Sequence, residues 1–167
     1  MFTGIIEAQG TLVALRHEGT NVHLDVRAPF TSSLQIDQSV AHDGVCLTVV
    51  AIEGDVYTVT AIEETLAKTH LGSCEVGHAF NLERCAVVGD RIDGHVVQGH
   101  VDTTGTLASV ETRDGSWILT IEHPHSMEWM TVPKGSIALS GISLTVVDSA
   151  PGRFTVAIIP YTWEHTN

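Results

Sequence analysis

The segment Gly44-Val45-Cys46-Leu47-Thr48-Val49-Val50 returns 97 residues later as Gly141-Ile142-Ser143-Leu144-Thr145-Val146-Val147. Both copies are rich in β-branched residues and predict strands. Side chains two positions apart on a strand point to the same face. We therefore expect Cys46 and Thr48 to face one space and Ser143 and Thr145 an equivalent one, so that the strands form the floors of two related pockets.

The repeat extends over most of the chain. Three blocks recur in the same order at offsets of 95 to 97 residues, which indicates two copies of one unit. Short alternating runs separated by Gly-rich turns predict an all-β fold of two tandem, similar, Greek-key-like closed β-barrels, because closure removes sheet edges. The further matching blocks are Gly4 with Gly99, Gly10-Thr11-Leu12 with Gly105-Thr106-Leu107, and Tyr57-Thr58-Val59 with Phe154-Thr155-Val156.

We assign residues 1–95 to the first unit and 96–167 to the second. At the offset of 97, Asn167 is equivalent to His70, and the first copy continues from there to a predicted closing strand at 79–83. We therefore expect an incomplete second barrel, whose closing strand belongs to an additional tail or to a partner. Helical turns are expected only at 29–34 and 126–130.

Composition limits the classes of partner. The chain of 167 residues is 43% hydrophobic, and 8 basic and 20 acidic residues give a net charge of −12. A negative field argues against nucleic acid and anionic membrane surfaces but permits a neutral small molecule. There is no signal-peptide pattern and no apolar run of about 18 residues. Three cysteines without CxxC spacing predict a reducing, cytoplasmic setting.

Six motifs stand in order along the whole chain: Met1–Glu7, Ala41–Val49, Gly94–Asp102, Lys134-Gly135-Ser136-Ile137, Gly141–Val146 and Ile159–Thr166. Together they resemble the riboflavin synthases of the α-subunit type. Asp93, Ser140, Tyr161 and Trp163 depart from the usual residues, and the family's final segment, a closing strand and a trimer-forming helix, has no counterpart.

The resemblance implies tandem barrels that each bind one 6,7-dimethyl-8-ribityllumazine. One lumazine gives a four-carbon unit to the other, yielding riboflavin and 5-amino-6-ribitylaminouracil without metal or cofactor. It also implies a homotrimer whose working site lies between the first barrel of one subunit and the second barrel of its neighbour. A non-catalytic lumazine- or flavin-binding protein and an inactive ligand-binding fragment remain as alternatives.

Strand-end amides and hydroxyls suit the ring edges and polyol tail of such a ligand. In the first unit the predicted substrate contacts are Phe2, Thr3, Gly4, Ile5, Ile6, Cys46, Leu47, Thr48, Thr60, Ala61, Ile62, Glu63, Glu64 and Thr65. In the second unit they are Gly99, His100, Val101, Lys134, Ser143, Leu144, Thr145, Ile158, Ile159, Pro160, Tyr161, Thr162 and Trp163.

The two copies differ at positions that bear chemistry. Cys46 of the first corresponds to Ser143 of the second, and His100 corresponds to Ile5. We hypothesise that Ser143 and His100 share the donor pocket, where the histidine moves a proton, and that Cys46 belongs to the acceptor pocket. The pairs His95/His100 and His123/His125 lack a nearby third ligand, so no metal is expected.

Overall fold

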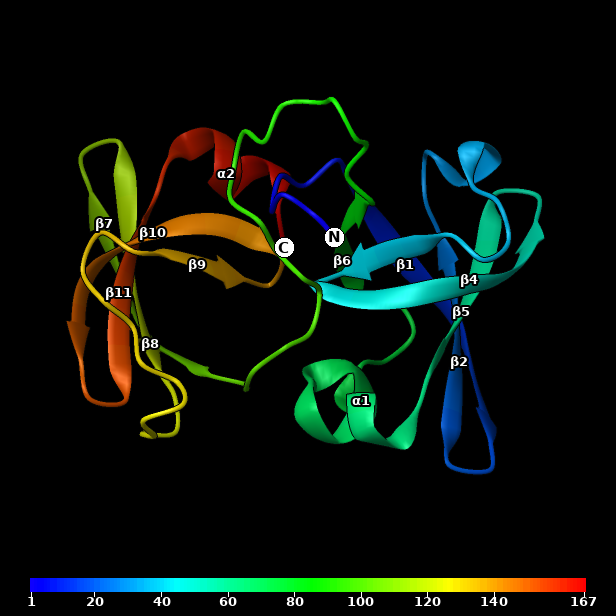
Figure 1. Ribbon diagram of the computed structural model, residues 1–167, viewed down its shortest axis with the longest axis horizontal. Helices are drawn as coiled ribbons and strands as arrows, with labels where there is room; N and C mark the ends of the chain where they lie inside the picture. Colours follow the sequence, from blue (N-terminus) through cyan, green and yellow to red (C-terminus); the bar gives the residue numbers. More distant parts are fainter.

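The computed structural model describes residues 1–167 as two β units side by side, with both chain termini near the middle (Figure 1). The first unit contains β1 (Ala8–Glu18), β2 (Asn21–Arg27), η1 (Thr31–Ser33), β3 (Ser39–His42), β4 (Val45–Glu53), β5 (Val56–Ala61), α1 (Glu63–Lys68), η2 (His70–Ser73) and β6 (Ala79–Arg84). The second contains β7 (Thr106–Arg113), β8 (Ser116–Glu122), β9 (Ser136–Leu139), β10 (Ile142–Ala150), β11 (Arg153–Ile158) and α2 (Pro160–His165).

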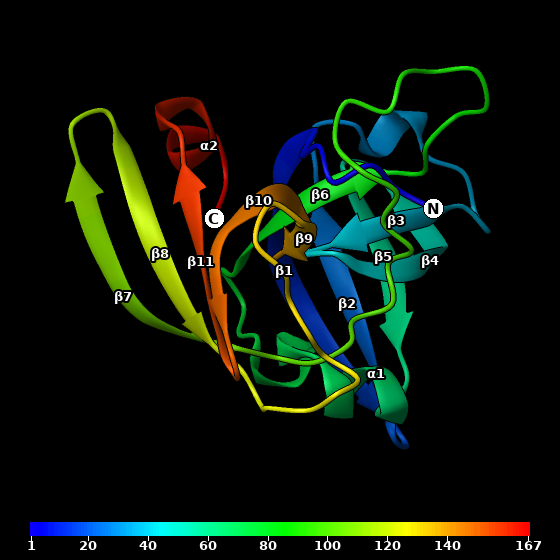
Figure 2. The same ribbon diagram turned by 60° about the vertical axis from the view of Figure 1, so that its left-hand side comes forward.

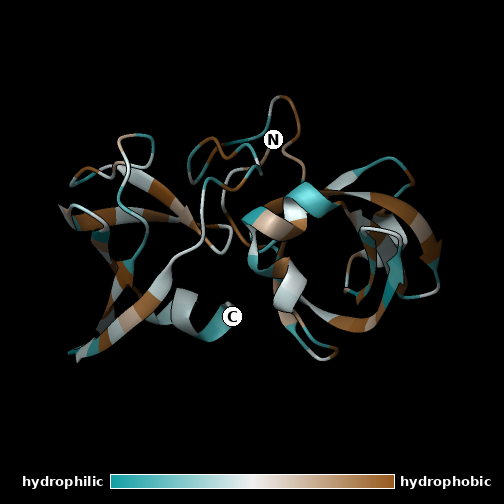
Figure 3. Ribbon diagram, turned by 90° about the horizontal axis from the view of Figure 1, so that it is seen from below, coloured by the Kyte–Doolittle hydropathy of each residue, from teal (hydrophilic) through white to brown (hydrophobic).

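The first unit is a closed antiparallel barrel in the order β1-β2-β5-β4-β3-β6. Strand β6 closes it by pairing with β1 on one side and β3 on the other. Alternate residues of β2, such as Leu24 and Val26, are completely buried and meet Phe80 of β6 in the core. The predicted closing strand at 79–83 is therefore confirmed, and Figure 3 shows apolar stretches concentrated on the strands of both lobes.

The second unit is an open five-stranded sheet in the order β7-β8-β11-β10-β9. Its core is smaller, built around Ile121, Val146, Phe154, Val156 and Ile158. Every residue of β7 is exposed, and Figure 2 shows this strand at the outer edge of the sheet. No strand joins β7 to β9 within residues 1–167, in agreement with the incomplete second barrel that we expected.

The two units meet through a local pseudo-symmetry. Phe2 and Val97 exchange both backbone hydrogen bonds, with N···O distances of 2.7 and 2.9 Å. The turns at Gly44 and Gly141 lie back to back, because a Cβ on Gly44 would stand only 2.9 Å from the amide nitrogen of Gly141. Glycine at both turns thus permits an approach that a side chain would block.

Two short helices differ from the sequence expectations. Helices α1 and α2 follow β5 and β11 at equivalent places in the repeat and were not predicted. Pro160 begins α2 at a position where its missing N–H has no cost. Of the two predicted helical segments, 29–34 contains η1, whereas 126–130 forms only a turn. The boundary at 95/96 falls in the segment between β6 and β7 and stays a prediction. No helix is long and apolar enough to cross a membrane.

Candidate active site

The repeated strands carry their polar residues on the outer faces of the two units. In β4, Val45, Leu47 and Val49 are at most 5% exposed and fill the barrel core, so Cys46 and Thr48 point outward. In β10, Val146 is buried and Leu144 packs on the second core, whereas Thr145 on the opposite face is exposed. The shared face that the sequence predicted is therefore formed in both copies, and it is the outer one.

Each of these strands is hydrogen-bonded to a segment of the other unit, the segment around Gly4 in one case and the segment around Gly99 in the other. The amide of Ser143 donates to the carbonyl of Gly4 at 2.7 Å, and the amide of Cys46 donates to the carbonyl of Gly99 at 2.8 Å. A Cβ on Gly4 would lie 2.7 Å from that of Ser143, and one on Gly99 would lie 2.6 Å from that of Cys46. The two segments therefore cross over, so that each polar strand is covered by the partner unit's glycine.

The histidine beside Ser143 is His95. Its Nδ1 lies 2.7 Å from Ser143 Oγ, and its backbone N–H donates to the carbonyl of Thr3 at 2.9 Å. Partial burial lowers the pKa of His95 below its usual 6.5, against a smaller opposing effect of the Glu83 charge. The imidazole is thus neutral near pH 7 and able to accept the hydroxyl proton of Ser143.

Glu83 at the end of β6 anchors the N-terminal segment that carries Gly4. Its Oε1 accepts from the amide and hydroxyl of Thr3, at 2.6 and 2.8 Å, and its Oε2 accepts from the amide of Gly4 at 2.9 Å. The residue is only 5% exposed, and these three donors satisfy the buried carboxylate. Glu83 therefore fixes the backbone that contacts both Ser143 and His95.

Within the chain, His100 is not the histidine that contacts Ser143. His100 follows Gly99, whose carbonyl binds the Cys46 strand, so the crossover brings this histidine to the other unit's polar strand. The sequence comparison aligned His100 with Ile5 but could not show that the segments exchange partners. In the sequence, His95 stands out only as a member of the Gly94–Asp102 motif and of a histidine pair, and Glu83 only as the end of the predicted closing strand.

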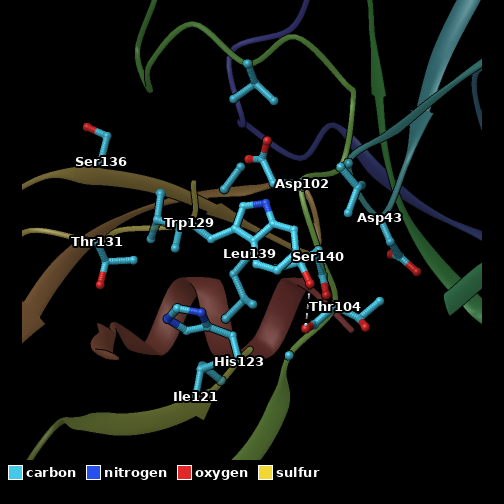
Figure 4. A pocket seen from close by; sticks show the side chains of 18 of the residues that line it. Asp43, Asp102, Thr104, Ile121, His123, Trp129, Thr131, Ser136, Leu139 and Ser140 are labelled. Atoms are coloured by element: carbon cyan, nitrogen blue, oxygen red, sulfur yellow. Dashed lines mark hydrogen bonds between the residues drawn. The ribbon is translucent and has the colours of Figure 1, made fainter. Parts of the chain in front are cut away.

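A cavity of about 750 Å³ lies between the units. Figure 4 shows Trp129 and Leu139 near its middle and Asp43 at one side. It includes Gly99, His100 and Val101 of the predicted contacts, and His123 on its wall has a buried Nε2 without a hydrogen-bond partner. A second, more apolar cavity of about 360 Å³ includes Leu144, Ile158 and Trp163. Ser143 and Cys46 line neither of these two cavities.

The remaining predicted contacts fall into three groups. Leu47, Ala61 and Phe2 are buried in apolar clusters, so the predicted side-chain contacts of Leu47 and Ala61 are replaced by core packing. A second group makes local contacts. The side chains of Thr60 and Glu64 bond those of His23 and Lys68. The carbonyls of Thr65 and Thr162 accept from the hydroxyls of Thr69 and Thr166, the amide of Lys134 donates to the carbonyl of Val146, and the Trp163 ring stacks on Trp117. The carbonyls of Ile62, Ile159 and Tyr161 also accept local bonds, from Leu66, Trp163 and His165, and the Tyr161 ring stacks on His165. The remaining predicted contacts are exposed or half-buried: Ile5, Ile6, Glu63, Val101 and Pro160.

The duplication is also found when the chain is compared with known protein families. The family described as the lumazine binding domain matches residues 3–85 and again 98–167. The riboflavin synthase of Actinobacillus pleuropneumoniae is 36% identical over 169 residues, covering 100% of this chain and 78% of that protein. The enzymes of Mycobacterium tuberculosis and Escherichia coli are 39% and 37% identical, covering 99% of this chain and 85% and 79% of theirs.

Solved structures of LumP have the same fold. LumP complexed with 6,7-dimethyl-8-(1'-D-ribityl) lumazine superposes with a TM-score of 0.90 over 100% of this chain and 91% of that one, at 20% identity. The riboflavin complex of LumP gives the same TM-score and identity. At this identity the likeness establishes the fold. The double domain match and the identity of 36–39% along the whole chain show that it belongs to the riboflavin synthase family.

Proposed function

We propose that this chain is a riboflavin synthase, which converts two molecules of 6,7-dimethyl-8-ribityllumazine into riboflavin and 5-amino-6-ribitylaminouracil. One lumazine donates a four-carbon unit to the other, so the reaction is a dismutation of two identical substrates. Identity above one third with named riboflavin synthases along the full chain supports this assignment.

The Ser143–His95 contact of 2.7 Å is the observation that carries the catalytic proposal. Ser143 Oγ, or a water that it orients, adds to the electron-poor ring of the donor lumazine, and neutral His95 takes up the proton. The strand of Cys46 binds the acceptor, whose acidic 7-methyl group attacks the donor. His100 is assigned to this acceptor side, because the preceding Gly99 binds Cys46.

Duplication serves a reaction between two like molecules. One strand face carries Ser143 with His95, and the other carries Cys46. When one face of each kind is placed opposite the other, the two bound lumazines are held in a fixed relative orientation. Such positioning supplies up to about 7–11 kcal/mol in favourable intramolecular reactions. Because Thr48 and Thr145 leave part of each face exposed beyond the covering glycines, we propose that the apposition occurs between subunits of a cytoplasmic homotrimer. Light scattering at working concentration measures the oligomeric state.

A non-catalytic lumazine carrier is the second candidate, favoured by the TM-score of 0.90 to LumP in complex with lumazine. The deciding experiment incubates the purified chain with 6,7-dimethyl-8-ribityllumazine and follows riboflavin absorbance. We expect turnover by the unchanged protein, its loss in Ser143→Ala with lumazine binding retained, and full activity in Ser32→Ala, an exposed serine. Tight lumazine binding without any riboflavin would establish the carrier instead.

A further inference from the structure

We propose that Asp43, His70, Cys74 and His78 form a binding site for a divalent transition-metal ion, for which Zn²⁺ is the best match. Donor atoms of His70, Cys74 and His78 all lie within 4.8 Å of one another. The Nε2 atoms of both histidines lie 3.0 Å from the same oxygen, Oδ2 of Asp43. Two imidazoles and a thiolate are three ligands of the kinds that zinc prefers, and the Asp43 carboxylate beside both imidazoles can supply the fourth.

The spacing of these atoms is near that of a coordination sphere. With bonds of about 2.0–2.3 Å, the ligand atoms of a tetrahedral zinc site stand about 3.3–3.6 Å apart. The two nitrogen–oxygen separations of 3.0 Å are about 0.3 Å below this range. The ligand atoms of His70, Cys74 and His78 lie within 4.8 Å of one another, so the longest of these three separations needs a contraction of about 1.2–1.5 Å at most. Small rotations of side chains on η2 and the following loop meet that need. The ion replaces the imidazole and thiol protons, which pass to solvent.

Asp43 is oriented in advance for this role. Its Oδ1 accepts from the amide of Asn81 at 2.7 Å and from the side-chain amide of Asn167 at 2.7 Å. Those bonds leave Oδ2 directed at His70 and His78. Metal-binding carboxylates are commonly held in this way by partners outside the coordination sphere. The side chain of Asp43 is 1% exposed, and without an ion its buried Oδ2 is paired with the two imidazoles, whose place beside it a cation can share.

His70, Cys74 and His78 face a common surface hollow, whereas Asp43 lies behind the two histidines. Cys74 is 8% exposed, whereas the side chains of His70 and His78 are 39% and 31% exposed. A surface hollow of about 390 Å³ is lined by these three residues together with Ser73, Glu75 and Val76. An ion can therefore enter from solvent without opening the barrel. Asp43, His70 and His78 also form part of the wall of the cavity between the units.

The turn at Asp43 and Gly44 does not depend on the cluster of Asp43, His70, Cys74 and His78 for its backbone conformation. The equivalent turn of the second unit has Ser140 where the first has Asp43, with φ of 45° against 48°. Asn167 stands where the first unit has His70. The same backbone is thus formed without a carboxylate or imidazole. The sequence prediction of no metal considered the pairs His95/His100 and His123/His125, and His95 is instead bound to Ser143.

Metal binding to the full chain tests the proposal independently of turnover. Protein stripped with a chelator is titrated with Zn²⁺ against a chromophoric competitor and, separately, with Co²⁺. We expect one equivalent per chain, a sulfur-to-cobalt charge-transfer band, and a rise in Tm with Zn²⁺. His70→Asn is expected to weaken zinc binding by about tenfold or more. Cys74→Ser is expected to lose the sulfur band, whereas Cys85→Ser, which removes an exposed cysteine, is expected to retain it.

Folding of each variant is followed by circular dichroism. A folded Cys74→Ser protein that keeps the full zinc affinity and the cobalt sulfur band overturns the proposal. So does a stripped wild-type chain that binds less than a tenth of an equivalent of Zn²⁺ or shows no change of Tm. The thermal shift of the wild-type chain keeps the test decisive even where a variant does not fold.

Discussion

Ser143 Oγ lies 2.7 Å from His95 Nδ1, although 48 residues separate them in the chain. His95 belongs to the segment between the units, whose backbone is tied to the N-terminal arm through the carbonyl of Thr3. The arm in turn covers the Ser143 strand through Gly4. The dyad is therefore assembled by the crossing of the two units, and substitutions at the crossing are expected to reach the chemistry.

Removing the base is the most direct test of the dyad. His95→Gln is expected to lower kcat by about 10²–10⁴-fold, the range for loss of general acid–base catalysis, with a smaller effect on lumazine binding. Steady-state kinetics with riboflavin absorbance measures both. His17→Gln, at an exposed position of β1, is the matched control and is expected to be unchanged. Turnover by His95→Gln equal to that of wild type would remove this histidine from the mechanism.

The lowered pKa of His95 gives a pH dependence of defined sign. The unfolded chain protonates this histidine near 6.5, whereas the folded chain does so only at lower pH. As the pH falls from 7.5 through 6.5, the unfolded state binds more protons and the free energy of unfolding decreases. Denaturant unfolding between pH 7.5 and 5 is expected to show a shallower decrease in His95→Gln than in wild type. An identical dependence of the free energy of unfolding on pH in the two proteins would contradict this prediction.

Glu83→Gln tests the anchor of the N-terminal arm. The amide group of glutamine offers one acceptor, so its NH₂ faces either Thr3 or the amide of Gly4, which is itself a donor. An unpaired buried donor costs about 1–3 kcal/mol, and displacement of Gly4 disturbs Ser143. We expect Glu83→Gln to lower the free energy of unfolding measured in urea by this amount and to reduce kcat. Glu18→Gln, an exposed acid on β1, is expected to change neither; equal effects in both would remove the special role of Glu83.

Gly4→Ala and Gly99→Ala test the close approach of the arms. Both glycines have positive φ, 77° and 86°, and both abut a Cβ of the opposite unit at under 3 Å. Gly19→Ala has a similar φ of 60° with no atom within 4 Å, so it isolates the backbone cost of about 1–2 kcal/mol. We expect the two arm variants to lose more stability than Gly19→Ala and to lose turnover, as measured by thermal unfolding and kinetics. Equal losses in all three would show that the contacts add nothing.

Buried pairing inside the first barrel gives a prediction on stability alone. Tyr57 OH lies 2.7 Å from His42 Nε2, and both side chains are completely buried. Tyr57→Phe leaves the imidazole nitrogen without a partner and is expected to cost about 1–3 kcal/mol in denaturant unfolding. Turnover per folded molecule is expected to be retained, because these side chains lie in the barrel core. A stabilised or unchanged protein would contradict the prediction.

The sequence by itself determined the duplication, the all-β class, the family and the fact that Cys46 and Thr48 share one face and Ser143 and Thr145 another. These follow from local regularities: period-two alternation, Gly-rich turns and repeated motifs, which neighbouring residues along the chain already express. The incomplete second barrel could also be predicted, because a missing strand is visible when the two copies are aligned. The short helices α1 and α2 were missed, since six residues carry little helical periodicity.

Only the tertiary structure decided which histidine meets Ser143 and which four residues converge around Asp43. Alignment of the copies placed His100 in the Ser143 pocket, but the glycine segments exchange between units and bring His95 there instead. Asp43 and His78 are 35 residues apart and meet because β3 and β6 are paired in the closed barrel. Contacts of this kind depend on strand order and on the packing of one unit against the other. No periodicity along the chain encodes them, so the site is a property of the fold rather than of its motifs.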